Sequence, residues 1–345
     1  MKKITAVLAT TVALVTVHPA AAGAATLPNQ IAYVRSGDIY VSSGPAERRL
    51  TTGGGHSRPR WSPDGRRIAY LTGAQLWTMN ADGTAQRRLT TRAAAGPSWS
   101  PDGKWIAFAS LSCTGGPGVY RLPAPATPAT PGTPATLAAL ATPATLATPA
   151  TLAKPGTTAT PEVLFPRDCR GEELPPEEPA TPRVGTLTDR LRTDDAVAWS
   201  PDGAKIAFRG GDCESVYDSC LSVGTVATGG EQTVAAYGGG SLQNRGFAVV
   251  PSWRGDGGRL AWTAYQEGET TAENEPVHLV EYDPATRAKH TVGGTLDREL
   301  AYLGTTRAVV TGQYRGGSWV TIVGLTDSSR SLFHSGSQPS VRPTR

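Results

Sequence analysis

The sequence has little net charge, few cysteines and no long hydrophobic run beyond its first residues. Its 33 basic and 29 acidic residues leave a formal net charge of +4, and Lys2 and Lys3 supply two of the positive charges. A net charge this small excludes the strongly basic surface with which proteins bind nucleic acid or an anionic membrane. The 40 glycines and 28 prolines argue against long helices and predict many short strands joined by turns.

The N-terminal segment has the pattern of a cleaved export signal. Two lysines precede an apolar run over residues 4–17, and a series of small residues follows. A run of about 14 residues is too short to span a bilayer, and the small residues suit a signal peptidase. We therefore expect residues 1–25 to be removed and residues 26–345 to form one exported domain, soluble in the periplasm or outside the cell, with no transmembrane span.

The four cysteines allow three disulfide pairings, and sequence alone does not choose among them. Disulfides are expected in an exported chain. Cys213 and Cys220 lie seven positions apart across an expected hairpin, so we favour this pair, which leaves Cys113 to pair with Cys169. Zinc is not expected, because there is no C-x-x-C spacing and no nearby pair of histidines.

A pentapeptide, Trp-Ser-Pro-Asp-Gly, occurs three times and leads each time into a short β-rich run such as Ile-Ala-Phe. A fourth, degenerate copy has the sequence Trp-Arg-Gly-Asp-Gly. In such a turn proline presets φ, aspartate accepts bonds from nearby backbone N–H groups and glycine adopts positive φ. Each copy therefore predicts a hairpin. The tryptophan, aspartate and glycine of the four copies are Trp61, Asp64 and Gly65; Trp99, Asp102 and Gly103; Trp199, Asp202 and Gly203; and Trp253, Asp256 and Gly257.

The spacing of the copies predicts a closed ring of blades. Each repeat holds four strands in roughly 40 residues, the size of one propeller blade. The segment from Ile31 to Thr51 lacks an innermost strand, and residues 338–341 at the C-terminus resemble one. If these two segments share a sheet, the ring closes and leaves no open sheet edge between its ends. We predict an all-β, six-bladed β-propeller of four-stranded antiparallel blades.

Two segments interrupt the third blade. Residues 123–161 consist almost wholly of Ala, Thr, Pro and Leu, so we expect an extended, mobile and disordered insert. The fourth strand of this blade is then residues 162–165 or residues 186–191. The repeat period favours the second choice, and the pairing of Cys113 with Cys169 favours the first, toward which we lean. A Pro- and Glu-rich surface loop over residues 166–185 follows from that choice.

The Trp-Ser-Pro-Asp-Gly repeat resembles the WD-like propeller repeat of the TolB family, over essentially the whole chain apart from the signal and the inserts. The resemblance implies a propeller fold. It also implies a binding function, because TolB-like periplasmic proteins are protein-binding components of envelope assemblies. Those proteins carry a small α/β domain ahead of the propeller. We expect none here, because only about five residues separate the expected signal from Ile31.

The repeated residues are expected to be structural. The four tryptophans should pack between blades, and the four aspartates lack the alternating acidic spacing of a calcium loop. No G-x-S-x-G, H-E-x-x-H or P-loop motif occurs, so we expect no catalytic, cofactor-binding or metal-binding residue. An acid–base pair of His56 with a nearby carboxylate is conceivable, but nothing in the sequence selects it.

Two functions remain after these exclusions. The first is a monomeric, non-catalytic scaffold that binds another protein or an envelope polymer, on its loop-bearing face or at the mouth of the central channel. The alternative is a propeller enzyme, a lyase or hydrolase acting on a polysaccharide or small metabolite at that mouth. An apolar or aromatic rim would favour the scaffold, and a converging cluster of His, Arg, Tyr and carboxylates would favour the enzyme.

Overall fold

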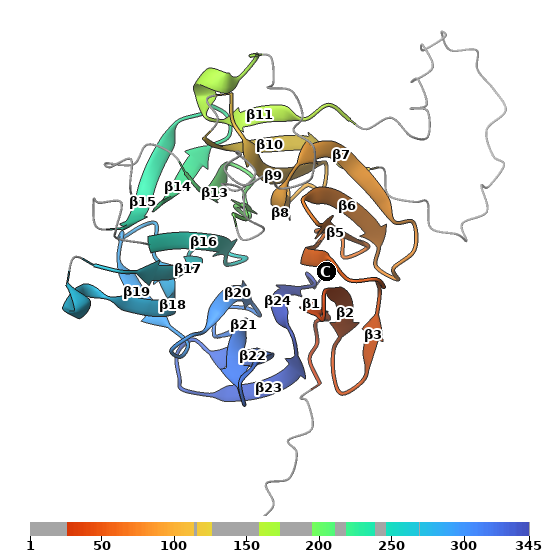
Figure 1. Ribbon diagram of the computed structural model, residues 1–345, viewed down its shortest axis with the longest axis vertical. Helices are drawn as coiled ribbons and strands as arrows, with labels where there is room; N and C mark the ends of the chain where they lie inside the picture. The colour runs from red at the N-terminus through yellow and green to blue at the C-terminus, as the bar shows by residue number, and fades with distance from the viewer. Residues whose placement is uncertain are drawn as a thin grey trace, which may run out of the picture.

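The computed structural model describes residues 26–113, 116–125, 159–172, 195–210, 219–238, 246–268 and 270–344. These residues form six four-stranded antiparallel sheets arranged as blades around a central axis (Figure 1). The only helices in these ranges are two short 3-10 helices, η1 (Arg167–Cys169) and η3 (Thr271–Glu273). The expected all-β, six-bladed propeller is confirmed.

The strands of each blade follow one another from the axis outwards. Blade one contains β24 (Ser337–Val341), β1 (Ile31–Arg35), β2 (Asp38–Ser42) and β3 (Glu47–Arg49); blade two β4 (His56–Trp61), β5 (Arg67–Thr72), β6 (Gln75–Asn80) and β7 (Arg87–Ala93); blade three β8 (Ala95–Trp99), β9 (Trp105–Leu111), β10 (Pro117–Pro123) and β11 (Glu162–Phe165); blade four β12 (Ala198–Trp199), β13 (Lys205–Arg209), β14 (Ser219–Thr225) and β15 (Glu231–Tyr237); blade five β16 (Gly246–Trp253), β17 (Leu260–Gln266), β18 (Glu275–Tyr282) and β19 (Lys289–Val292); and blade six β20 (Arg298–Tyr302), β21 (Arg307–Tyr314), β22 (Gly317–Gly324) and β23 (Arg330–Ser335).

The ring is closed by the C-terminal strand. β24 pairs antiparallel with β1, with Ile31 opposite Val341 and Ala32 opposite Ser340. The backbone N–H of Arg342 continues the pairing by donating to the carbonyl of Gln30 at 2.8 Å. The C-terminal segment thus supplies the innermost strand that blade one lacks, as predicted.

The third blade resolves the choice left open by the sequence. Its outermost strand is β11, over residues 162–165, and it pairs with β10. β10 reaches Pro123, which lies opposite Trp105, so the ladder extends one residue into the expected insert. Most of that insert, most of the second expected loop and the expected signal at residues 1–25 lie outside the described residues.

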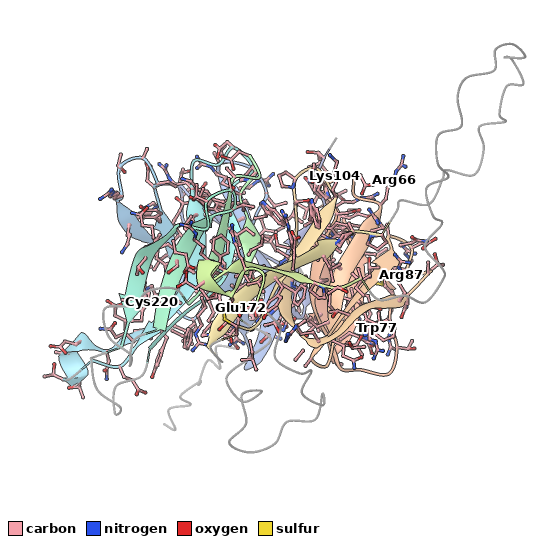
Figure 2. All side chains as sticks on the ribbon, turned by 90° about the horizontal axis from the view of Figure 1, so that it is seen from above. Arg66, Trp77, Arg87, Lys104, Glu172 and Cys220 are labelled. Atoms are coloured by element: carbon pink, nitrogen blue, oxygen red, sulfur yellow. A yellow bond between two sulfur atoms is a disulfide. The ribbon has the colours of Figure 1, made fainter. Side chains whose placement is uncertain are left out.

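The ring has two distinct faces. We call the face that carries the four Asp-Gly hairpins, over residues 62–66, 100–104, 200–204 and 254–258, the turn face, and the opposite one, where the innermost strands begin, the mouth face. Figure 2 shows Arg66 and Lys104, both in these hairpins, along its upper edge, and Cys220 and Trp77 toward the other face. All innermost strands therefore run from the mouth face to the turn face.

A disulfide ties the edge of blade three to its interior. Cys113 follows β9, Cys169 ends η1, and the two are bonded with their Cα atoms 5.5 Å apart. This pairing agrees with the sequence analysis. Cys220 is also disulfide-bonded; its expected partner Cys213 lies outside the described residues.

Replacing Cys113 and Cys169 by serine together is expected to lower the free energy of unfolding by about 3 kcal/mol. The two residues are 56 positions apart, and a cross-link over such a loop limits the conformations of the unfolded chain. Denaturant titration of the wild type and the double variant measures the difference. A loss below about 0.5 kcal/mol would contradict the expectation.

Candidate functional site: the mouth of the central channel

The repeated aspartates and glycines cap the hairpins of the turn face. Asp64 accepts hydrogen bonds from the Ser62 hydroxyl at 2.6 Å and from the Arg66 backbone N–H at 3.0 Å. These bonds lower the carboxyl pKa of Asp64 even though burial raises it. Asp102 and Asp202 make equivalent bonds, whereas Asp256 accepts from the Arg254 guanidinium and the Gly258 backbone N–H. The four glycines after these aspartates all have φ between 64° and 75°.

The repeated tryptophans lie where neighbouring blades meet. The indole N–H of Trp99 donates to the carbonyl of Arg60 in the preceding blade at 3.0 Å. Trp253 does the same to the carbonyl of Ala198 at 3.2 Å. The guanidinium of Arg67 lies 4.8 Å from the centre of the Trp99 ring, which adds a cation–π contact.

The histidines are dispersed over the fold. His56 Nε2 lies 3.8 Å from Asp38 Oδ1, but Asp38 already accepts hydrogen bonds from Arg49 at 2.5 Å and from Thr51 at 3.1 Å. His278 and His290 lie on β18 and β19. Among the described residues, no group of three or more His, Cys, Asp or Glu side chains is placed to hold a metal ion.

A cavity of about 450 Å³ opens at the mouth face, where the innermost strands of blades one, two, five and six converge. One wall comes from blade five and is apolar, with Phe247, Val249 and Val277. The Phe247 ring stacks on Tyr265, with ring centres 5.3 Å apart. The other wall is polar and charged. A ligand in the cavity would therefore contact an apolar surface on one side and charged groups on the other.

Four lining residues hold the same place in their strands. Each lies three positions before the residue that ends the innermost strand, and each has a left-handed backbone that residues other than glycine seldom adopt. They are Arg58 (φ 52°), Val250 (φ 53°), Glu299 (φ 61°) and Gln338 (φ 57°). Strain of this kind costs on the order of 1 kcal/mol per residue and often marks functional sites. We call these residues the left-handed ring.

An ion pair joins two members of the left-handed ring, one in blade two and one in blade six. Arg58 Nη1 lies 2.8 Å from Glu299 Oε1, and the two residues are only 3% and 8% exposed. The Thr311 hydroxyl and the Gln338 backbone N–H donate to Glu299 Oε2 at 2.6 and 2.9 Å. The Arg58 backbone N–H in turn donates to Gln338 Oε1 at 2.7 Å. One bonded network therefore links blades one, two and six.

This network keeps Glu299 ionised. Burial raises the carboxyl pKa, but Arg58 and the hydrogen bonds from Thr311 and Gln338 outweigh it, so the pKa lies below its ordinary value. A carboxylate so engaged is a poor proton donor at neutral pH. No residue of this site belongs to a motif recognised in the sequence. The signal that marks these residues is their shared strand position, visible once the six innermost strands are aligned on their final residues.

The fold is similar to that of known propellers. TolB from Acinetobacter baumannii superimposes with a TM-score of 0.60 and 14% identity, over 93% of this chain and 68% of that one. A putative TolB from Agrobacterium tumefaciens gives 0.54 and 13%, over 90% of each chain. A chain of a nidogen/laminin complex gives 0.54 and 8%, over 91% of this chain and 98% of that one. The protein therefore has a TolB-like β-propeller fold.

No protein-family model matches the sequence, and no curated protein matches it. At identities below 15%, the structural likeness shows a shared fold and does not show a shared function. Within the described ranges, no helix combines the length and apolar character needed to cross a membrane.

Proposed function

We propose that the protein is an exported, non-catalytic propeller that binds another protein or an envelope polymer at the mouth of its central channel. The observation that carries this proposal is the aromatic and aliphatic wall of blade five, which faces a charged wall in the same cavity. Apolar surface gives affinity, and a few fixed polar groups give orientation, in most binding sites. Export is supported by the Cys113–Cys169 disulfide, because such bonds persist in oxidising compartments.

The composition of the cavity supports binding over catalysis. Its lining contains one carboxylate, Glu299, and neither histidine nor cysteine. Glu299 is committed to Arg58 and Thr311, so it does not offer the free acid or base that a hydrolase or lyase requires. The resemblance of the repeat to TolB-like proteins agrees with a binding role.

The proposal predicts that a change in the apolar wall abolishes partner capture. Purified wild type, Phe247→Ser and Trp105→Ser serve as baits for the native cell envelope. Phe247 lines the cavity, whereas Trp105 is a comparably half-buried aromatic at the turn face. We expect the wild type and Trp105→Ser to recover the same component and Phe247→Ser to recover at least tenfold less, the equivalent of about 1.4 kcal/mol.

A fourth bait lacking residues 126–158 tests the role of the expected insert. We expect it to recover the component as the wild type does, because the cavity is built from other segments. Equal capture by Phe247→Ser, or no specific component on any bait, would overturn the proposal. Loss of capture with the deletion alone would assign binding to the insert.

A further inference from the structure

Arg60 occupies a position that is small in every other blade. The residue next to the end of the innermost strand is serine or alanine in five of the six blades. These residues are Ser98, Ala198, Ser252, Ala301 and Ser340. Only blade two places a long, charged side chain there.

This position lies where adjacent innermost strands approach one another. The hydroxyl of Ser340 in blade one accepts a hydrogen bond from the backbone N–H of Trp61 in blade two, at 3.3 Å. Ser98 in blade three accepts one from Trp199 in blade four, at 2.9 Å. A side chain as long as arginine extends beyond such a contact. Arg60 lies on β4, the innermost strand of blade two, within electrostatic range of Glu299 on the innermost strand of blade six.

No carboxylate in the described part of the chain forms an ion pair with Arg60. Glu299, whose charge acts on it, is already paired with Arg58. Its guanidinium donates to the neighbouring carbonyl of Pro59 at 3.0 Å. Burial, and then repulsion from Arg58, lower the Arg60 pKa to about 10, although Glu299 partly opposes them. A partly buried cation without an ion-pair partner is stabilised by an added anion.

The cavity at the mouth face lies close to this charge. Arg58, which lines the cavity, lies two residues before Arg60 on β4. Arg60 is only partly buried, so a small anion in solution can reach it. A guanidinium binds carboxylate and phosphate groups through two parallel hydrogen bonds.

We propose that Arg60 holds a small oxyanion, a carboxylate or a phosphate group, in the central channel. The site is complete within this chain and does not depend on the partner proposed above. Its test therefore needs no partner.

The thermal midpoint Tm is measured for the full chain at pH 7 in sodium chloride, sodium phosphate and sodium acetate at equal ionic strength. For the wild type we expect a saturable rise in phosphate, acetate or both, of about 5 °C at a hundredfold excess over Kd. A rise in both salts identifies general oxyanion binding, and a rise in one identifies the preferred group. Isothermal titration with the same salts gives Kd directly.

Arg60→Ser restores the residue of blades one, three and five, and it is expected to remove the rise while leaving Tm in chloride unchanged or higher. Arg66→Ser removes an exposed arginine from the turn face and should keep the full rise. If Arg60→Ser does not fold, Arg60→Lys replaces it. That variant should bind at least tenfold more weakly, because an ammonium lacks the paired donors. No rise in the wild type, the same rise in Arg60→Ser, or unchanged affinity in Arg60→Lys would overturn the proposal.

Discussion

A chain that ends at Gly336 is expected to lose its cooperative thermal transition, or to melt more than 10 °C below the full chain. The truncation removes β24, the innermost strand of blade one, and leaves Ile31 and Ala32 of β1, both fully buried in the intact ring, without their neighbour. Exposure of a buried strand face costs roughly 1.5–3 kcal/mol for each large apolar side chain.

The lost strand also joins three blades. Ser340 accepts a hydrogen bond from Trp61 of blade two, and Gln338 bonds both Arg58 of blade two and Glu299 of blade six. At about 1 kcal/mol for each net hydrogen bond, these losses add to the lost burial. The total approaches the 5–15 kcal/mol that stabilises a typical domain. The effect should therefore spread beyond blade one.

Differential scanning calorimetry of three samples tests the closure. A chain that ends at Arg342 keeps β24 and the bond to Gln30, so it should melt within about 3 °C of the full chain. A synthetic peptide of residues 337–345, added to the truncated chain, should restore part of the transition. A truncated chain that melts like the full one would show that the ring does not depend on this strand.

The blades and their closure were predictable from the sequence because their determinants are local and repeated. Asp64 specifies a turn through bonds to residues two positions away, and Gly65 supplies the positive φ. The same chemistry recurs at Asp102 and Asp202. The pairing of Cys113 with Cys169 followed by elimination from the close spacing of Cys213 and Cys220 in the sequence. Such features need no knowledge of the rest of the ring.

The channel site was not predictable in the same way. The four members of the left-handed ring differ in residue type, so no repeated letter marks them. Glu299 and Arg58 are far apart in the sequence and come together only because blades six and two both face the axis of a closed ring. Arg60, by contrast, left a readable signal, since it replaces a small residue at one position of the repeat.

The two arginines of β4 have opposite expected effects on stability. Arg58 has a buried carboxylate partner, and Arg60 has none among the described side chains. Removal of Arg60 relieves an uncompensated charge, whereas removal of a partner of Arg58 creates one. The contrast follows from the single carboxylate that the cavity lining provides.

Glu299→Ala is therefore expected to lower the free energy of unfolding by about 3–5 kcal/mol, because it leaves Arg58 buried without a counter-charge. Glu299→Gln should have a smaller effect, since its carbonyl oxygen can still accept from Thr311 and Gln338. The double variant Arg58→Met, Glu299→Gln should lose less than the sum of its two single variants, which denaturant titration of all four proteins measures. Additive losses would show that the ion pair does not couple the two blades.

The pH dependence gives an independent measure of the same pair. The pKa of Glu299 in the folded protein lies below its ordinary value of 4.5, so the unfolded chain takes up the proton at a higher pH than the folded one. The stabilisation from ionised Glu299 is therefore complete above about pH 4.5 and is lost as the pH falls through the lower, folded pKa. The stability difference between the wild type and Glu299→Gln should stay constant from pH 7 to 5 and narrow below 4.5. Other carboxyl groups titrate in both proteins and cancel in this difference, so an equal gap at pH 7 and pH 3 would show that the charge of Glu299 does not stabilise the fold.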